Sequence, residues 1–403
     1  MKKYLTMVGI DTVILTLRAS DFALLEPSRF TPNAMKIYNT EPKDMGRNKY
    51  ISAICNPTKQ DNSIFGYLPY ITLYKALRAG GLSVNLRIQF SAPKIIFGNN
   101  VDEPSEQDFE RICEAIFEGL KYYNIRLFRG IDAIKDARVA MIHYSKNFIL
   151  EHGLSSRASI LELQRIDVNS WRDVSLTDYN NGYGFKVHSK YYEVAFYDKI
   201  AEHFKGHHGQ PLFDKDLQNQ LNLFANPDIL RLPEILRLEV RLNNTKSIKT
   251  ALNKAGLDVS DLTFKALFNA KYSQKVLQQH LDDLYSHYPN ITEADVGDSL
   301  ELLSELYMQN PNRSISTILS AIGLFTISKE HSTRAMKDII GSKGSSKLLR
   351  LAKKVNKELK YHSNKSEIFN FLEDRLERFE PISIANSVIS TKISNNERGN
   401  DYA

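Results

Sequence analysis

The chain has 403 residues, 42% of them hydrophobic and 25% charged, which is enough apolar material for two or three domains with a buried core. The net charge of +6 and the pI of about 8.9 favour a polyanionic partner without identifying one. The two cysteines, Cys55 and Cys113, exclude a disulfide framework and a cysteine-rich zinc site, and are typical of a reducing cytoplasm.

The N-terminal segment is predicted to be a strand and not a targeting sequence. Its apolar stretch contains Asp11 and ends at Arg18, and residues 12–18 alternate between apolar and polar as a strand does. The chain has no run of about 18 uncharged apolar residues, so we expect neither a transmembrane helix nor a membrane partner.

The first half of the chain mixes strand and helix patterns. Strands are predicted over residues 12–18, 67–75, 83–91, 137–145 and 235–243, and Gly80-Gly81 and Asn180-Asn181-Gly182 are predicted hairpin turns. A helix is predicted over residues 105–123, because Ser105 can cap an acidic first turn and apolar residues then recur at helical spacing. The segment after the second hairpin turn is a strand that ends near Tyr197.

From about Thr245 onward the periodicity is helical throughout. We therefore predict three parts. Residues 1–245 form an α+β domain around a mostly antiparallel sheet, residues 246–385 form an all-helical domain, and the polar residues 386–403 form a flexible tail.

The stretch "EVAFYDKIAEHF" raises the first functional hypothesis. A β-prone run ends in Tyr197, and Lys199 follows two residues later. If the strand continues, the two side chains lie on the same face about 7 Å apart. A phenol has a pKa near 10, so a nucleophilic Tyr197 needs a base, a cation or a metal beside it. A core aromatic and a solvated edge-strand lysine explain the same residues.

Hard metal ligands are the next requirement of such chemistry. The candidates are His143, His188, Glu202 and Glu239, none with diagnostic spacing. Glu239 lies on one face of a strand between Arg237 and Arg241, a pattern that a solvent-facing charge ladder explains equally well.

The sharpest electrostatic feature lies in the C-terminal half. Residues 333–365 contain ten Lys or Arg residues against two acids. Several recur three or four residues apart and share one face of a continuous helix: Lys343, Lys347, Arg350, Lys354 and Lys357. This pattern favours DNA phosphate contacts by Lys347, Arg350, Lys354 and Lys357 over a merely solvated basic face, so we expect residues 246–385 to be a DNA-binding domain.

Four stretches together resemble the gene II replication initiators of filamentous phages and related rolling-circle plasmid initiators. They are "IDTVILTLR", "LRIQFSAPKIIFGNNV", "VAFYDKIAE" and "LRLEVRLNN…LNKAGL", and they keep the family's order over residues 10 to 257. The resemblance implies an HUH-like nicking and joining endonuclease in residues 1–245, with Tyr197 as nucleophile, Lys199 assisting charge, and Mg²⁺ or Mn²⁺ held by His143, Glu202 and Glu239.

The chain departs from the family's pattern on one strand. In "VAMIHYSKN", His143 stands where the resemblance leads us to expect an aspartate, and Met141 replaces an arginine. An imidazole can bind Mn²⁺, so the departure bears on the identity of the metal more than on the tyrosine chemistry.

The function implied by the resemblance is initiation of rolling-circle DNA replication in a bacterial cytoplasm. The implied partners are phage or plasmid origin DNA, double- and single-stranded, the host helicase and the replication machinery, with oligomerisation on DNA left open. Two alternatives remain: a mobilisation relaxase, which uses the same chemistry on a transfer origin, and a non-enzymatic DNA-binding regulator in which Tyr197 belongs to the core.

Overall fold

A computed structural model gives the fold. It describes residues 6–45, 49–78, 81–150, 155–164, 166, 174–179, 183–190, 192–204, 234–286, 299–330, 339–341, 343–344, 346–348, 350–351, 354–355 and 367–383. This part of the chain is a mixture of helices and antiparallel strands, in agreement with the α+β prediction.

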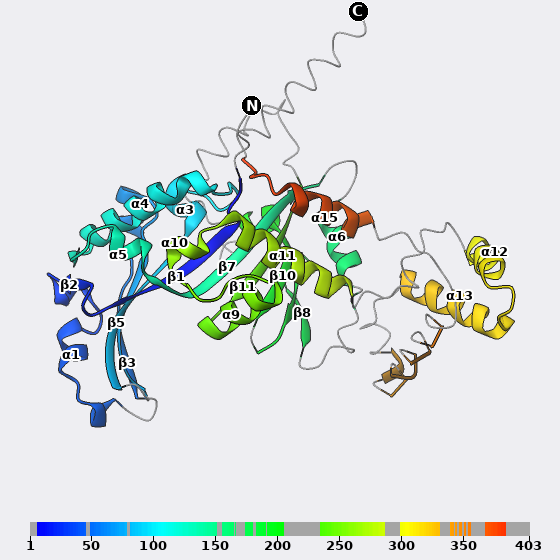
Figure 1. Ribbon diagram of the computed structural model, residues 1–403, viewed down its shortest axis with the longest axis horizontal. Helices are drawn as coiled ribbons and strands as arrows, with labels where there is room; N and C mark the ends of the chain where they lie inside the picture. The colour runs from blue at the N-terminus through cyan, green and yellow to red at the C-terminus, as the bar shows by residue number, and fades with distance from the viewer. Residues whose placement is uncertain are drawn as a thin grey trace, which may run out of the picture.

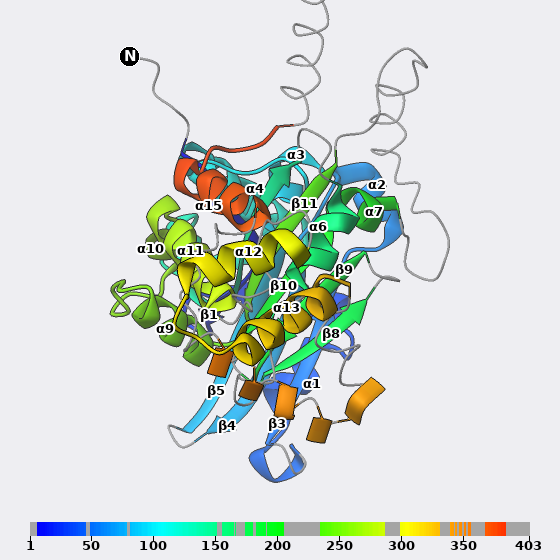
Figure 2. The same ribbon diagram turned by 90° about the vertical axis from the view of Figure 1, so that its right-hand side faces the viewer.

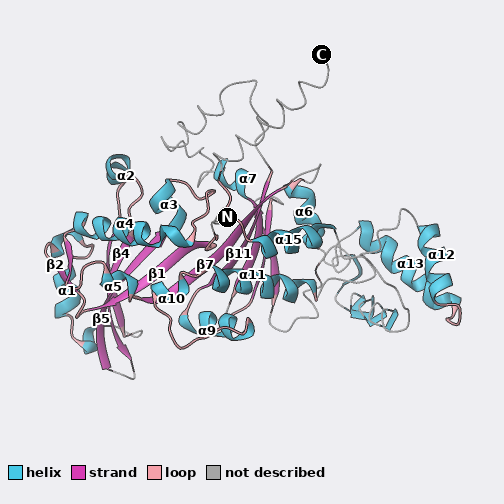
Figure 3. Cartoon of the chain, turned by 45° about the horizontal axis from the view of Figure 1, so that its top comes forward, coloured by secondary structure: helices cyan, strands magenta, loops and turns pink. Residues whose placement is uncertain are grey.

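Nine of the described strands form one sheet in which every neighbouring pair is antiparallel (Figure 3). Their spatial order is β3 (Tyr50–Cys55), β4 (Tyr70–Arg78), β5 (Gly81–Ser91), β1 (Ile10–Arg18), β7 (Arg138–Ile149), β11 (Ile235–Leu242), β10 (Glu193–Asp198), β9 (Gly184–His188) and β8 (Ser175–Tyr179). A second, two-stranded sheet pairs β2 (Phe22–Leu24) with β6 (Ile125–Leu127).

The predicted strands are confirmed, with shifted ends. The hairpin between β4 and β5 is present, because Arg78 pairs with Gly81. β7 continues four residues beyond its predicted end, to Ile149. The predicted turn at residues 180–182 lies outside the described residues, although β8 and β9 pair on either side of it through Tyr179 and Gly184.

The described helices lie beside the sheet and after it in the chain. They are α1 (Ala34–Asn39), α2 (Lys59–Phe65), α3 (Ala92–Phe97), α4 (Phe109–Tyr122), α5 (Asp132–Lys135), α6 (Ser156–Leu163), α7 (Lys199–Phe204), α9 (Thr245–Lys254), α10 (Phe264–Leu267), α11 (Ala270–Tyr285), α12 (Ser299–Gln309), α13 (Ile315–Glu330) and α15 (Glu367–Arg378), with short 3-10 turns at Pro27–Arg29, Pro42–Asp44 and Glu106–Asp108. None of these described helices is long and apolar enough to span a membrane.

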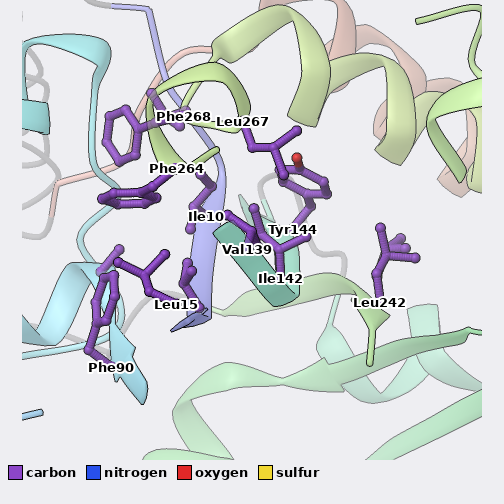
Figure 4. Close-up of a cluster of buried hydrophobic side chains, with 14 of the residues drawn as sticks. Ile10, Leu15, Phe90, Val139, Ile142, Tyr144, Leu242, Phe264, Leu267 and Phe268 are labelled. Carbon is purple, nitrogen blue, oxygen red and sulfur yellow. The ribbon is translucent and has the colours of Figure 1, made fainter. Parts of the chain in front are cut away.

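One face of the sheet packs against helices and forms the main core. Because side chains alternate along a strand, one set of residues in β1, β7 and β11 points to this face and is mostly apolar, with Lys146 of β7 as a buried exception. Helices α9, α10, α11 and α15 lie over it (Figure 1). Figure 4 shows the centre of this core, where Leu15 lies beside Phe90, and Val139 and Ile142 lie beside Ile10 and Tyr144.

The helical stretch after residue 245 does not pack as one unit. Ile248 of α9, Leu277 of α11 and Leu372 of α15 belong to the same buried core as the sheet. A separate, smaller core joins α12 and α13 with Leu348 and Val355, and Figure 2 shows these two helices beside each other. The expected boundary near 245 therefore marks a change of secondary structure and not a change of core, because α9 and α11 cover the sheet.

A C-terminal strap, residues Phe379–Ser383, returns to the sheet after α15. The Glu103 N–H donates to the Ile382 carbonyl oxygen at 3.1 Å, and the Glu103 carboxylate accepts from the Ile382 N–H at 2.9 Å and from Lys146 Nζ at 2.8 Å. Lys146 Nζ also donates to the Glu380 carbonyl oxygen at 2.8 Å. The strap thus fixes the loop between α3 and α4 against β7. The predicted tail, residues 386–403, lies outside the described residues.

Candidate active site and metal centre

The opposite face of the sheet carries polar and charged side chains where β7, β11 and β10 meet. Strand register places Tyr197 beside Arg237, Glu239 beside Ser145, and Arg241 beside His143. Because side chains alternate, these three pairs point to the same side of the sheet. The Tyr, Glu and His that the sequence singled out are therefore brought to one face, although 96 residues separate the first from the last.

A β-bulge adds Asp11 to this group. Ile10 pairs with Tyr144 and Val13 pairs with Ile142, so Asp11 and Thr12 together oppose the single residue His143. A bulge of this kind redirects side chains locally and is frequent beside active sites. Here the bulge in β1 brings the carboxylate of Asp11 close to His143 of β7 and Glu239 of β11.

Asp11, His143 and Glu239 have the geometry of a metal centre. Their ligand atoms all lie within 4.8 Å of one another, and His143 Nδ1 is 3.1 Å from Glu239 Oε1. On the other side of the ring, His143 Nε2 lies 3.3 Å from the side-chain oxygen of Asn243, which fixes the ring's orientation. Two carboxylates and one imidazole form a donor set that suits Mn²⁺ and, less well, Mg²⁺.

Glu239 contacts His143, Arg241 and Tyr197 on this face, and it is only 3% exposed. A solvent-facing charge ladder is therefore excluded for this residue. Burial alone would raise the pKa of its carboxyl, but the hydrogen bond from His143 and the charges of Arg241 and Arg237 hold that pKa well below its usual range. Glu239 is an ionised acceptor, ready to bind a cation or a hydroxyl.

The Tyr197 hydroxyl donates a hydrogen bond of 2.7 Å to Glu239 Oε2. This bond connects the candidate nucleophile directly to the candidate metal centre. The phenol is 3% exposed, and its burial raises its pKa well above the usual value, while the charge of Arg237 opposes that rise. In this arrangement the hydroxyl is oriented but enclosed.

Arg237 is a fully buried cation next to Tyr197. Its guanidinium donates to Asp11 Oδ1 at 2.9 Å, to Ser145 Oγ at 2.7 Å and to the Asn100 carbonyl oxygen at 2.9 Å. Its Nε has no acceptor among the described residues. A buried, unsatisfied guanidinium N–H is costly to leave unpaired and suits an anionic ligand such as a phosphate.

Lys199 is buried, in contrast to the solvated edge-strand lysine that the sequence allowed. β10 ends at Asp198, so Lys199 is the first residue of α7 and not a further strand residue. Its Nζ nevertheless lies 5.5 Å from the centre of the Tyr197 ring. Burial first, and then the charge of Arg237, lower the pKa of its ammonium group to about 8.

Glu202 is not brought to the candidate metal centre. It lies on α7, one turn after Lys199, and accepts a hydrogen bond of 2.7 Å from Lys199 Nζ. The reason is that the chain turns from strand to helix at residue 199, which moves the carboxylate away from the strand face. Of the three expected metal ligands, the structure groups His143 and Glu239, and Asp11 takes the third place.

The remaining sequence candidates lie elsewhere. His188, on β9, interacts with Thr177 Oγ1 of the neighbouring strand at 3.1 Å. The proposed DNA-contacting residues Lys347, Arg350 and Lys354 are exposed, while Leu348 and Val355 pack on the second core. Lys357 lies outside the described residues.

Sequence reasoning missed Asp11 and Arg237 as site residues. Asp11 was available as a signal, because it is the one acid in an otherwise apolar and uncharged stretch of strand before Arg18. Arg237 was noted only as a neighbour of Glu239. Neither role could be assigned without the bulge and the strand register that bring both residues to one place.

Residues 74–264 match the family described as the N-terminal part of a phage replication-associated protein. The matched segment runs from within β4 to beyond β11 and contains His143, Tyr197 and Glu239, whereas Asp11 precedes it. This part of the chain is therefore similar to replication-associated phage proteins. The resemblance to the filamentous-phage gene II family is thereby confirmed over these residues. No curated protein and no solved structure matches the chain significantly.

Proposed function

We propose that this protein is a rolling-circle replication initiator that nicks and rejoins one DNA strand through Tyr197, on an HUH-like arrangement of the sheet. One observation carries the proposal. The Tyr197 hydroxyl is hydrogen-bonded to Glu239, and Glu239 shares a three-residue metal-type cluster with Asp11 and His143. All but Asp11 lie in the segment that matches the replication-associated family.

In the proposed reaction the Tyr197 hydroxyl passes its proton to Glu239, which already accepts its hydrogen bond, and the phenol oxygen attacks a phosphodiester phosphorus. The bond from phosphorus to O3′ breaks, O3′ takes up a proton to become the 3′-hydroxyl, and the 5′ phosphate remains on the tyrosine. The 3′-hydroxyl then primes DNA synthesis. Joining is the reverse attack by a 3′-hydroxyl on the phosphotyrosine, and it needs no ATP because the phosphodiester bond energy is conserved.

Each polar group of the site has a role in this reaction. Glu239 orients the phenol, and Arg237 and Lys199 place positive charge beside the position of the phosphate. Asp11, His143 and Glu239 would hold Mn²⁺ or Mg²⁺, which would polarise the phosphate oxygens when bound. The enclosure of Tyr197 means that DNA binding has to be coupled to an opening of the chain around α7.

The same enclosure favours a second candidate function. A tyrosine that is 3% exposed and already hydrogen-bonded can be a structural core residue. The chain would then be a non-enzymatic DNA-binding regulator. In that case the polar cluster beneath the tyrosine would stabilise the sheet and would take no part in phosphoryl transfer.

Covalent trapping separates these two functions. The full chain is incubated with Mn²⁺ and single-stranded oligonucleotides that tile the replicon encoding it, and adducts are detected as a shift in denaturing gels. We expect an adduct with the wild-type chain and none with Tyr197→Phe, which removes only the hydroxyl. Tyr192→Phe, on the same segment, is the matched control and should keep the adduct.

Two outcomes contradict the proposal. An adduct that persists in Tyr197→Phe would move the nucleophile to another residue. A wild-type chain that binds the replicon DNA but forms no adduct on any tile would favour the regulator.

A further inference from the structure

The sheet face that carries the candidate active site continues over four more strands. Along β1, β5, β4 and β3 most residues of the helix-covered face are buried, as Leu15, Leu86 and Leu73 illustrate with 0% exposure, although Leu82 near the β4–β5 turn is exposed. The alternate residues point the other way and are half-buried or exposed, except Tyr74 and the strand-end residues Ala76 and Ser91. This half of the sheet therefore has one covered face and one open face.

The open face has a definite chemical character. We define it by Tyr50, Tyr70, Tyr74, Arg18, Arg87 and Gln89, which point to the same side according to the strand register. Tyr50 is 38% and Tyr70 is 41% exposed. From Thr12 onward in β1, and throughout β5, β4 and β3, the sequence contains no Asp or Glu. An aromatic and arginine surface without acids suits a polyanion with flat, stackable groups.

Arg87 and Tyr74 form the preorganised centre of the open face. Tyr74 lies on β4, between Arg87 of β5 and Tyr50 of β3. The Arg87 guanidinium carbon is 4.5 Å from the centre of the Tyr74 ring, and the centres of the Tyr50 and Tyr74 rings are 5.8 Å apart. Arg87 Nε is buried and has no acceptor among the described residues. A stacked guanidinium with an unused N–H is already positioned to receive an anionic oxygen.

The open face is continuous with the metal-type cluster. Gln89 of β5 pairs with Ile14 of β1, and Ile14 pairs with Met141 of β7. Met141 is two residues before His143 on the same strand, so both side chains point to the same side. With strands about 4.8 Å apart, Gln89 is roughly 10 Å from Met141 across the sheet. A ligand on the open face therefore approaches the cluster without leaving the sheet.

We propose that the open face binds the single-stranded DNA that flanks the reacting phosphate. Bases stack on Tyr50 and Tyr70, and Arg18 and Arg87 contact phosphates. Unpaired bases favour this face over a duplex, because only a single strand can present base faces to tyrosine rings. That the bound strand leads toward Tyr197 rests on the proposed nicking function. That the ligand is single-stranded DNA rests on the chemistry of the open face alone.

The test measures binding of fluorescein-labelled oligodeoxythymidine to the full chain in EDTA, so that no cleavage occurs. The double variant Tyr50→Ala with Tyr70→Ala should bind about 100-fold more weakly, at about tenfold for each lost base stack. The double variant Arg18→Gln with Arg87→Gln should lower the slope of log K against log salt by about 1.4, at about 0.7 for each phosphate contact on a single strand.

Matched controls and a cross-link make the result decisive. Phe128→Ala with Arg126→Gln removes an exposed aromatic residue and an exposed arginine away from the open face, and should leave binding unchanged. An iodouracil-substituted oligonucleotide should photo-cross-link to peptides containing Tyr50 or Tyr70. Because the cross-link uses the unaltered chain, it gives a result even if a variant fails to fold.

The outcomes separate this inference from the nicking proposal. Cross-links that map only outside the open face, or wild-type affinity in the folded tyrosine variant, would overturn the inference while an adduct at Tyr197 could still form. Loss of binding in both variants together with no adduct in the wild type would support the open face and overturn the nicking proposal. A loss confined to duplex DNA would also overturn the inference.

Discussion

The two halves of one sheet face, the candidate active site and the open face, differ in whether their polar side chains bond to one another or to solvent. Around β7, β11 and β10 the charged groups are buried and depend on one another: Arg237 holds Asp11, and Glu239 holds His143 and Arg241. On the open face around β5, β4 and β3 most polar side chains are half-buried or exposed, with Tyr74 as an exception. Substitutions in the first half should therefore cost both stability and activity, whereas substitutions in the second should affect only binding.

The largest effect is expected for Asp11→Ala. This change leaves the buried Arg237 guanidinium without its carboxylate, and breaking a buried ion pair costs about 3–5 kcal/mol. Thr16→Ala on the open half of the same strand should change stability by less than about 0.5 kcal/mol. Urea unfolding of the two variants measures both values. Equal losses would remove the distinction between the two halves.

His143→Ala should reduce nicking by about 100-fold or more and leave single-stranded DNA binding intact, because it removes a ligand from the metal-type cluster. His143→Asp should restore activity and shift the preference from Mn²⁺ towards Mg²⁺, since carboxylate suits the harder ion. His188→Ala, which alters a histidine outside the cluster, is the control. Adduct formation with each metal is the measurement, and unchanged cleavage in His143→Ala would exclude His143 from the site.

A third region, the basic surface at Lys347, Arg350, Lys354 and Lys357, extends the comparison to duplex DNA. Replacing all four residues with Gln should lower the slope of log K against log salt by roughly 3 to 4 for duplex origin DNA, at about 0.9 per contact. Nicking of a short single-stranded oligonucleotide should change little, because its proposed binding surface lies on the sheet. Salt titration of the binding constant is the measurement.

The control for this surface is a second quadruple Gln variant at exposed basic residues elsewhere, Lys36, Lys43, Lys121 and Arg126. It should keep the wild-type slope. Equal slopes in both quadruple variants would mean that residues 343–357 are a solvated face and that duplex binding lies elsewhere.

The smallest effect concerns pH. Burial and the neighbouring Arg237 lower the pKa of Lys199 to about 8, while Glu202 and Asp11 act in the opposite direction. Below this pH Lys199 carries its charge, and above it the charge is lost. The adduct rate of the wild type relative to Lys199→Arg should therefore fall several-fold between about pH 7 and pH 9, because the arginine stays charged.

Dividing the two rates cancels the deprotonation of the phenol, which is common to both proteins. A ratio that does not change with pH would mean that the Lys199 charge plays no part in the proposed reaction.

The sequence by itself determined the central strands of the sheet, the helical character of the residues after 245 and the resemblance to the matched family. Alternation of apolar and polar residues reports the two faces of a strand, and this local pattern predicted β1, β4, β5, β7 and β11 to within a few residues. The chemistry of Tyr197, His143 and Glu239 was also accessible, because the resemblance placed each on a particular strand. The expected roles of these residues stay predictions.

Only the tertiary structure decided which residues meet. Asp11 and Arg237 lie 226 positions apart, and it takes a bulge in β1 and the register of β11 against β7 to bring them within 2.9 Å. Glu202 was expected at the same cluster, but the chain leaves the strand at Lys199 and turns it away. Helices α9 and α11 likewise joined the core of the sheet, although the sequence assigned them to another domain.

The physical reason for this division is the range of the interactions. A strand's hydrophobic alternation and a helix's cap depend on neighbours within a few residues, so they can be seen in the sequence. A buried charge depends on partners from distant strands, since it is stable only where a carboxylate, an imidazole or a guanidinium meets it. These contacts between distant side chains depend on strand order, register and bulges, which no short stretch of this chain specifies.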